Sequence, residues 1–370
     1  MALHEIRIDP TLPLREQPGT GHNRWHPDIP PVVRCDPGDE VVMETRDAFD
    51  GQMGPNATLK TVEAPDLDVV HPLTGPVHVE GAQPGDLLEI EILEIVPDSY
   101  GFTVQVPGFG FLRDVFPEPF IVRWQLADGW ATSDDLPGVR IPAAPFMGTI
   151  GLSPGHESLA RITAREQAAL ERGGFVLPPS PDGAVPGGVA GATGLRTIPP
   201  REQAGNVDIK QLGAGTRLYI PVDTPGALFS AGDAHFAQGD CEACGTAIEM
   251  AATLRVRFTV HPGEAAEKGI RAPRFARSDY WVAAPFAAPR RFYATTGMSV
   301  SRDGEVAAED ATLAARNALL DMIDHLGERG WSPQQAYAIC SVAVDLKVSQ
   351  LVDVPSFLVS AFLPEDIFTG

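Results

Sequence analysis

The chain has 370 residues, of which 44% are hydrophobic and 21% are charged, values that are typical of a globular protein with a large core. Asp and Glu outnumber Lys and Arg by 49 to 28, which excludes nucleic acid and anionic membranes as expected partners because phosphates attract cationic side chains. No membrane-spanning helix is visible, and the opening residues lack a basic head followed by an apolar run. We therefore expect a cytoplasmic protein.

Three turn-then-strand units predict a β-rich body. Residues 36–39 (DPGD) lead into EVVMET, residues 83–86 (QPGD) lead into LLEIEILEI, and residues 213–223 have the same shape. In the second unit apolar and acidic residues alternate, which is typical of a strand with one wet face. Together with 35 Pro and 37 Gly, this pattern favours many short strands in sandwich or barrel-like pieces.

A segment rich in proline and glycine divides the chain. Residues 178–200 read PPSPDGAVPGGVAGATGLRTIPP, which predicts either a disordered linker or an ordered flap over a site. We accordingly expect a β-rich lobe over residues 1–175, a loop or flap over 176–205, and a third part over 206–370. That third part holds the candidate catalytic strands and the C-terminal helices.

Two helices are predicted late in the chain. An apolar stripe at spacings of four, three and four predicts a helix over residues 308–326. A second helix starts at Ser332, where Pro333 and Gln335 complete a capping-box pattern, and runs toward residue 345. The closing VPSFLVSAFLP predicts a final strand. The predicted fold is mainly β with an α+β segment, in which both late helices pack on a sheet.

Residues 230–250 read SAGDAHFAQGDCEACGTAIEM and contain no Lys or Arg. An extended chain would place Asp233 and His235 on one face. After a break at Gly239, Asp240 and Glu242 would also share a face. A solvated acidic loop has no need of an imidazole framed by apolar runs, so this stretch indicates a metal-assisted hydrolytic site.

A strand is predicted to follow directly from Thr246. Its apolar positions alternate with polar ones, at Ile248, Met250, Ala252, Leu254, Val256 and Phe258. Glu249 falls on the opposite face, at the start of the strand. There it either reaches back to the site or pairs with Arg255 or Arg257.

The segment GDAHFAQGDCEACGTAIE resembles the signature of the acetamidase/formamidase family, which reads approximately G-D-x-H-x-x-Q-G-D-G-E-x-x-G-x-A-I-E. Further segments are similar to that family in the same order: HPLTGPVHVEGAQPGDLLEIEI from His71, PFMGTIGLSP from Pro145, PREQAGNVDIKQL from Pro200, LYIPVDTPGALFSAGD from Leu218, ATTGM from Ala294 and DLKVSQLVDVPS near the end. Two positions depart from it, since Cys241 and Ala204 stand where the family has Gly. A positive φ at residue 241 would strain a cysteine there.

The resemblance implies a metal-dependent hydrolase of simple amides, built from β-sandwich and barrel-like pieces with an α+β segment and assembled as a homo-oligomer. The expected reaction cleaves the C–N bond of short neutral amides, of the formamide and acetamide class, to a carboxylate and ammonia. Some relatives act on γ-lactams, so opening of a small lactam is an alternative activity.

Amide hydrolysis requires a nucleophile, a polarised carbonyl and a protonated leaving nitrogen. A divalent metal, expected to be Zn²⁺, supplies the first two, and a nearby Glu supplies the third. The expected metal ligands are Asp47, Asp233, His235 and Glu249; the general base is Glu242, oriented by Asp240; and Gln238 and Asn206 hold the amide.

Other interpretations of these residues remain open. Asp47 is equally compatible with a turn residue, and His71 with either a fifth ligand or a structural role. Cys241 and Cys244 form a C-x-x-C without the partners of a zinc knuckle or a thioredoxin-like unit, which favours two small turn residues. A Cys241 nucleophile assisted by Glu242 is an alternative. A further alternative is a non-catalytic β-sandwich binding protein that Ca²⁺ stabilises, since Ca²⁺ prefers oxygen ligands.

Overall fold

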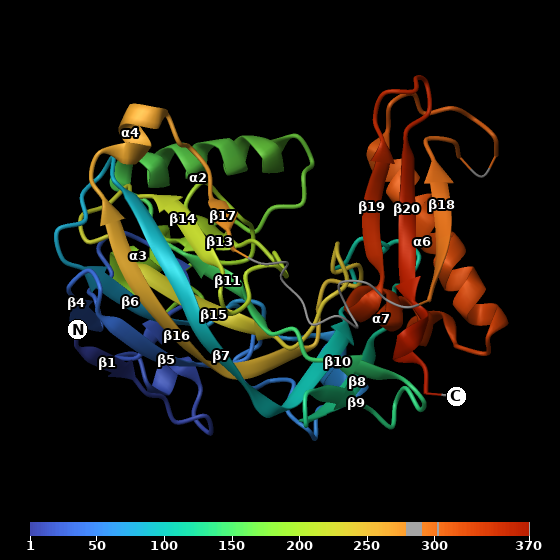
Figure 1. Ribbon diagram of the computed structural model, residues 1–370, viewed down its shortest axis with the longest axis horizontal. Helices are drawn as coiled ribbons and strands as arrows, with labels where there is room; N and C mark the ends of the chain where they lie inside the picture. Colours follow the sequence, from blue (N-terminus) through green and yellow to red (C-terminus); the bar gives the residue numbers. More distant parts are fainter. Residues whose placement is uncertain (279–290, 302, 370) are drawn as a thin grey trace.

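The computed structural model describes residues 1–278, 291–301 and 303–369. Figure 1 shows a large β-rich body at the left and a smaller C-terminal unit at the right, where a short sheet lies beside two helices. The prediction of a mainly β protein with an α+β segment is confirmed.

The main sheet of the β-rich body has fifteen strands among the described residues. They are β1 (Leu3–Ile6), β2 (Gly21–His22), β4 (Val33–Cys35), β5 (Glu40–Thr45), β6 (Leu73–Val79), β7 (Leu87–Gln105), β8 (Phe120–Ala127), β9 (Trp130–Thr132), β10 (Arg140–Pro142), β11 (Phe146–Gly151), β13 (Ala204–Asn206), β14 (Arg217–Pro221), β15 (Phe229–His235), β16 (Glu249–His261) and β17 (Arg274–Ala276). A separate pair joins β3 (Arg24–Trp25) to β12 (Leu195–Arg196).

Strands β7 and β16 form a long antiparallel pair within this sheet. Their pairing runs from Glu249 opposite Phe102 to His261 opposite Leu87. All three predicted turn-then-strand units form strands, namely β5, β7 and β14. The alternation of apolar and charged residues explains this arrangement, because it gives β5, β7 and β16 one buried and one wetter face.

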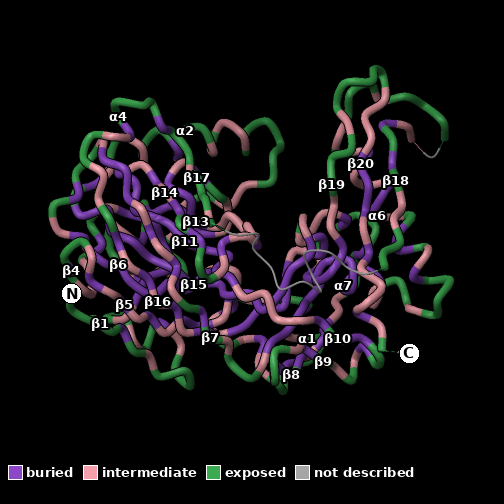
Figure 2. Tube along the Cα trace, viewed as in Figure 1, coloured by how far each residue is buried: buried purple, intermediate pink, exposed green. Residues whose placement is uncertain are grey.

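Strand β15 is buried along its whole length, between β11 on one side and β6 and β16 on the other. Its small residues permit this close packing: a Cβ at Gly232 would lie 2.5 Å from the carbonyl oxygen of Pro72. In Figure 2, buried chain runs through β11, β15 and β16. The acidic stretch therefore begins in the interior of the protein.

The C-terminal unit combines three antiparallel strands with the two predicted helices. The strands are β18 (Phe292–Met298), β20 (Leu358–Pro364) and β19 (Asp345–Gln350), with β20 in the middle. Helix α6 (Ala311–Glu328) starts where the Asp310 carboxylate accepts a hydrogen bond from the Leu313 N–H, and α7 (Pro333–Ala343) starts with the predicted capping box at Ser332. Helix α6 packs on β18, where Thr295 donates to the Ala318 carbonyl.

Among the described residues, the remaining helices are α1 (Leu59–Glu63), α2 (His156–Glu171), α3 (Gly188–Thr193) and α4 (Glu264–Lys268), with short 3₁₀ turns at Leu14–Glu16 and Glu365–Ile367. Helix α2 was not expected from the sequence. Only Leu159 and Ile162 of this helix are buried, so its apolar stripe is too short to stand out. Among the described residues, no helix has the length and apolar character to cross a bilayer.

The segment rich in proline and glycine is anchored to the β-rich body. The buried guanidinium of Arg24 donates to the carbonyls of Ser180 and Asp182, and β12 pairs with β3. Ile198 and Pro200, near the end of the segment, line the cavity described below. An ordered flap beside a site fits this placement, and the division into three parts stays a prediction.

Candidate active site

The candidate site forms where β15 ends and β16 begins. His235, the last residue of β15, lies directly across from Glu249, the first residue of β16. On the other side of β15, the pairing with β11 skips one position, at which Asp233 has a φ of +55°. The two side chains lie close together as predicted, although the chain at Asp233 is not regularly extended.

Three carboxylates surround the Nε2 atom of His235. The nearest oxygens are Oε2 of Glu249 at 3.2 Å, Oδ1 of Asp233 at 3.4 Å and Oε1 of Glu242 at 3.9 Å. Glu249 is held in place by the Ala247 N–H, which donates to its Oε1 atom. The predicted group of Asp233, His235, Glu242 and Glu249 is therefore one spatial cluster.

Gln238 orients the imidazole of His235. Its Oε1 atom lies 2.9 Å from Nδ1, and its Nε2 atom donates to the carbonyl of Asp208. Because the amide oxygen can only accept, Nδ1 carries the hydrogen and Nε2 faces the carboxylates. Both polar groups of Gln238 are engaged inside the protein, where they position His235, and its expected role in holding the substrate stays a prediction.

Asp208 joins the cluster and was missed in the sequence. One oxygen each from Asp208 and Asp233 and one nitrogen of His235 lie within 4.8 Å of one another, as do ligand atoms of His235, Glu242 and Glu249. Gly148 makes room for this arrangement, since a Cβ there would lie 2.7 Å from Oδ1 of Asp208. A signal existed, because Asp208 lies two residues after Asn206 in the segment PREQAGNVDIKQL.

Asn206 lines the cavity but has both polar groups engaged. Its Oδ1 atom lies 2.9 Å from Oγ1 of Thr149, and its Nδ2 atom donates to the carbonyl of Ile198. The same Thr149 hydroxyl lies 3.0 Å from Oδ2 of Asp233. Asn206 therefore belongs to a network that ends at Asp233, and its role in holding the amide stays a prediction.

Burial and mutual repulsion shift the pKa values of the cluster. Burial raises the pKa of Glu242 to about 8 and that of Glu249 to about 7, and it also raises the pKa of Asp208, which lies beside Glu242. Burial also disfavours the charged forms of His235 and Asp233, but their attraction to neighbouring groups of opposite charge outweighs this effect. The pKa of His235 is therefore raised and that of Asp233 is lowered.

The donor set fits a divalent cation. Three buried atoms in it have no hydrogen-bond partner among the described residues, namely Nε2 of His235, Oε2 of Glu249 and Oδ1 of Asp208. Leaving such atoms unpaired is costly, and cation binding in the two ligand groups that share His235 would satisfy them. An imidazole among carboxylates is a donor set of catalytic zinc sites.

The loop that carries Glu242 is attached to α7 by several hydrogen bonds. The Tyr337 hydroxyl donates to the carbonyl of Ala243, while Oγ of Ser341 accepts from the Cys244 N–H at 3.0 Å and donates to the carbonyl of Thr246. The C-terminal unit therefore fixes the backbone that directly follows the predicted general base.

Neither cysteine of the C-x-x-C has the surroundings of a nucleophile. Cys241 is exposed and does not line the cavity, whereas Cys244 is buried. Burial raises the pKa of the Cys244 thiol to about 11, so little thiolate forms near neutral pH. The geometry agrees with two turn residues and not with a cysteine nucleophile.

Both departures from the family pattern occupy positions with positive φ. Cys241 has a φ of +95° and Ala204 one of +69°. Non-glycine residues in this region carry a backbone strain of about 1–3 kcal/mol. The strain anticipated at residue 241 is therefore present.

Replacing Cys241 with Gly should raise the free energy of unfolding by about 1 kcal/mol, because glycine relieves this strain. Denaturant titration measures the change. Ala243→Gly is the matched control: Ala243 is in the same loop without a positive φ, so added chain entropy should lower its stability by about 0.5–1 kcal/mol. Equal effects of the two substitutions would contradict the assignment of strain to residue 241.

Asp240 does not orient Glu242. Its carboxylate lies 3.3 Å from Nζ of Lys210, which also pairs with Asp345 at the start of β19. The Asp240 N–H donates to the same Asp345 carboxylate. The prediction of a catalytic role for Asp240 is corrected accordingly, because its contacts anchor the loop to the C-terminal unit.

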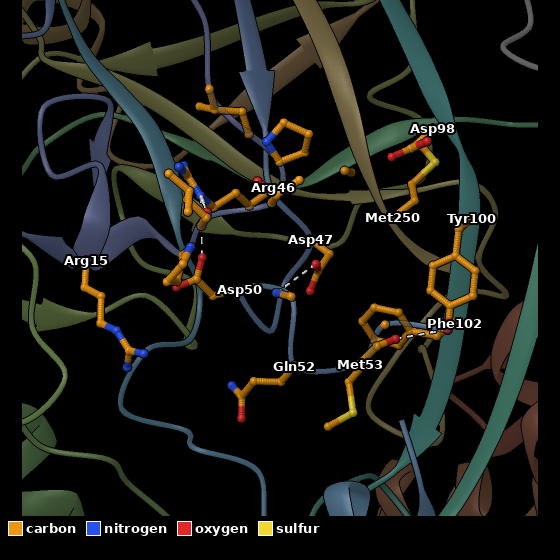
Figure 3. A pocket seen from close by; sticks show the side chains of 18 residues that line it. Arg15, Arg46, Asp47, Asp50, Gln52, Met53, Asp98, Tyr100, Phe102 and Met250 are labelled. Carbon is orange, nitrogen blue, oxygen red and sulfur yellow. Dashed lines mark hydrogen bonds and ion pairs between the residues drawn. The ribbon is translucent and has the colours of Figure 1, made fainter. Parts of the chain in front are cut away.

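Asp47 is not part of the cluster. Its carboxylate accepts hydrogen bonds from the N–H groups of Phe49 and Gly51, the pattern of a turn residue. Figure 3 shows it in another cavity, of about 440 Å³, together with Arg46 and Tyr100. The expected ligand role is therefore corrected to a structural one, whereas Asp208 lies in the cluster.

The cluster lies at the wall of a cavity of about 300 Å³. Its polar lining includes Asp233, Glu242, Glu249, Asp208, Asn206 and His71, and much of the rest is apolar. His71 is buried with its Nδ1 atom unpaired among the described residues, so both readings of His71 stay open. Arg255 and Arg257 pair with other acids on neighbouring strands, which leaves Glu249 to the site.

Comparison with known proteins agrees with this geometry. The model of the acetamidase/formamidase family matches residues 7–370. The chain is 37% identical to a formamidase of Methylophilus methylotrophus, over 98% of this chain and 93% of that protein, and 35% identical to an acetamidase of Mycolicibacterium smegmatis, over 90% and 87%. The fold matches a γ-lactamase from Delftia acidovorans with a TM-score of 0.94 and 35% identity, covering 100% of this chain and 94% of that one.

Proposed function

We propose, from the premise that the chain belongs to the acetamidase/formamidase family, that it hydrolyses short neutral amides to a carboxylate and ammonia. The observation that carries this proposal is the buried imidazole of His235, which faces three carboxylates at the wall of a largely apolar cavity. Opening of a γ-lactam cleaves the same kind of bond, and the similarity to a γ-lactamase favours it as a second substrate class.

His235, Asp233, Glu249 and Asp208 are proposed to hold a divalent cation, for which Zn²⁺ is the leading candidate. When bound, the cation supplies Lewis acidity that polarises a carbonyl and lowers the pKa of water. Gln238 keeps the unprotonated nitrogen of His235 directed at the site. The imidazole favours zinc over calcium, which prefers oxygen ligands, and so favours an enzyme over a binding protein stabilised by calcium.

Glu242 is proposed to act as the general acid and base. It lies farthest from Nε2 of His235 among the three carboxylates, lines the cavity and has a pKa raised to about 8. A carboxyl that titrates near neutral pH can take a proton from the attacking water and give it to the departing nitrogen. The surrounding apolar walls limit competing water.

An ammonia-release assay tests the proposed function. Formamide and acetamide are each supplied to the purified protein, before and after treatment with a chelator, and elemental analysis identifies the metal. A γ-lactam is supplied in parallel, and the amino acid formed by ring opening is measured because a lactam releases no ammonia. Turnover that chelation removes and zinc restores supports the proposal. Turnover that survives complete metal removal contradicts the metal-assisted mechanism.

Metal binding should become more stabilising as pH rises. The raised pKa values of Glu242, Glu249 and His235 favour the folded, metal-free protein at pH values below their ordinary pKa values. The contributions of Glu249 and Glu242 are lost as pH rises through about 7 and about 8, respectively. Asp233, with a lowered pKa, acts in the opposite sense and only in acid. Since the cation displaces these protons, zinc should raise the Tm of chelator-treated protein more at pH 8 than at pH 5. An equal gain at both values would contradict the proposed ligands.

The protein is further proposed to be a cytoplasmic homo-oligomer. Phe292 and Met298 lie six residues apart on β18 and are both more than half exposed. Residues at even spacing share one face of a strand, so a second copy of the chain packed on this face would bury both side chains. Light scattering of the purified protein determines the number of subunits.

A further inference from the structure

The cavity beside the cluster is much larger than a formamide molecule. It measures about 300 Å³. If each non-hydrogen atom takes about 30 Å³, the share of one water in the liquid, the three atoms of formamide fill roughly a third of this space. A site built for so small a molecule would leave most of its volume to water.

The walls away from the acidic cluster are apolar. They are formed by Ala48, Phe49, Leu67, Val70, Val104, Val106, Phe109, Ile198, Pro200 and Val207. Most of these side chains belong to, or pack against, one hydrophobic cluster. The cavity is thus an opening in a hydrophobic core, with its polar groups gathered around Asp233, Glu242 and Glu249.

The charges around the cavity restrict the ligand further. Its described lining contains four carboxyl groups, those of Asp208, Asp233, Glu242 and Glu249, and no Lys or Arg. At the apolar walls, an amide with its own carboxylate would lose hydration and find no cationic side chain as a partner. Apolar walls likewise exclude a substrate with several hydroxyl groups, because those groups would lose hydrogen bonds to water.

We infer that the preferred substrate is a neutral amide that carries an apolar group of about five carbons, with the amide at the acidic cluster and the apolar group against the walls around Phe109 and Leu67. This inference rests on the proposed function and deepens it. Each methylene transferred from water to such a wall strengthens binding by about fourfold.

A chain-length series tests the inference. We expect kcat/KM for ammonia release to rise about fourfold per methylene from acetamide to butyramide and hexanamide. N-Butylformamide, followed by formate release, and a γ-lactam with an alkyl substituent test whether the apolar group lies on the amine side or within a ring. An optimum at formamide or acetamide overturns the inference and leaves the amidase intact, whereas no turnover of any amide overturns both.

Two substitutions in the walls provide a second test. Leu67 and Phe109 are only half-buried, so both positions should tolerate a change in size. Leu67→Trp should lower the ratio of kcat/KM for hexanamide to that for formamide at least tenfold, and Phe109→Ala should move the optimum to longer chains. Leu320→Trp, at a half-buried position on α6 that does not line the cavity, should leave the ratio unchanged. A ratio that responds equally to Leu67→Trp and Leu320→Trp contradicts the inference.

Discussion

Replacing His235 with Ala should lower amide turnover by at least about 10³-fold while the protein remains folded. The imidazole is the only nitrogen donor in the two ligand groups found among the described residues, and it belongs to both of them. Without it, the carboxylates of Asp233 and Glu249 face each other with no cation between them, and one of them should take up a proton. Ammonia release and metal content are the measurements.

The matched control for this variant is His261→Ala. His261 lies at the far end of β16 and pairs with Glu89, away from the cavity. It should keep both metal and activity, since only an exposed or partly exposed ion pair is lost. Turnover of His235→Ala at the rate of the His261→Ala protein would remove the assigned site from consideration.

Replacing Glu242 with Gln should reduce turnover by at least about 10²-fold without removing the metal. Glutamine keeps the shape of the side chain but cannot take up and release a proton near neutral pH. Glu249→Gln should instead lose metal, because the Glu249 oxygen lies 3.2 Å from Nε2 of His235 whereas that of Glu242 lies 3.9 Å away. Kinetics and elemental analysis of both variants distinguish the two roles.

The pH profile adds an independent readout for Glu242. Its carboxyl must be ionised to accept a proton, so kcat of the native enzyme should rise with pH as Glu242 ionises, at or below its metal-free pKa of about 8, because a bound cation lowers that value. In Glu242→Gln this rise should be absent. If Glu242→Gln lost its metal, Glu242 would be a ligand and another group would have to serve as the base.

Local patterns in the sequence predicted much of the fold. Alternation identified β5, β7 and β16, and the capping box at Ser332 placed the start of α7 to the residue. These features depend on neighbours in the chain, which a sequence displays directly. Helix α2 was missed because most of its surface faces solvent, which leaves little periodicity to detect.

The candidate site could be predicted only where its residues are close in sequence. Asp233, His235, Glu242 and Glu249 lie within seventeen residues of one another, and the structure brings all four together. Asp208 reaches the cluster from a separate segment, through the pairing of β11 with β13 and β15. Such pairing is a property of the folded sheet and leaves no local pattern.

Asp47 and Asp240 were given roles that their contacts in the structure do not support. Asp240 follows Gln238 by two residues, yet it is drawn to Lys210 and Asp345, while the Gln238 amide turns back to His235. Asp47 precedes a tight turn whose N–H groups it satisfies. The polar groups of these side chains are hydrogen-bonded or ion-paired within the protein. Such partners determine whether a polar residue has a catalytic or a structural role.

The hydrogen bonds from Tyr337 and Ser341 to the loop around Glu242 make the two parts of the molecule interdependent. A fragment that ends before α7 would keep the proposed metal ligands, but the loop that carries Glu242 would lose its hydrogen bonds to α7. Local unfolding of about the last forty residues, by heat or after proteolysis, should therefore abolish turnover before the proposed metal ligands separate from one another.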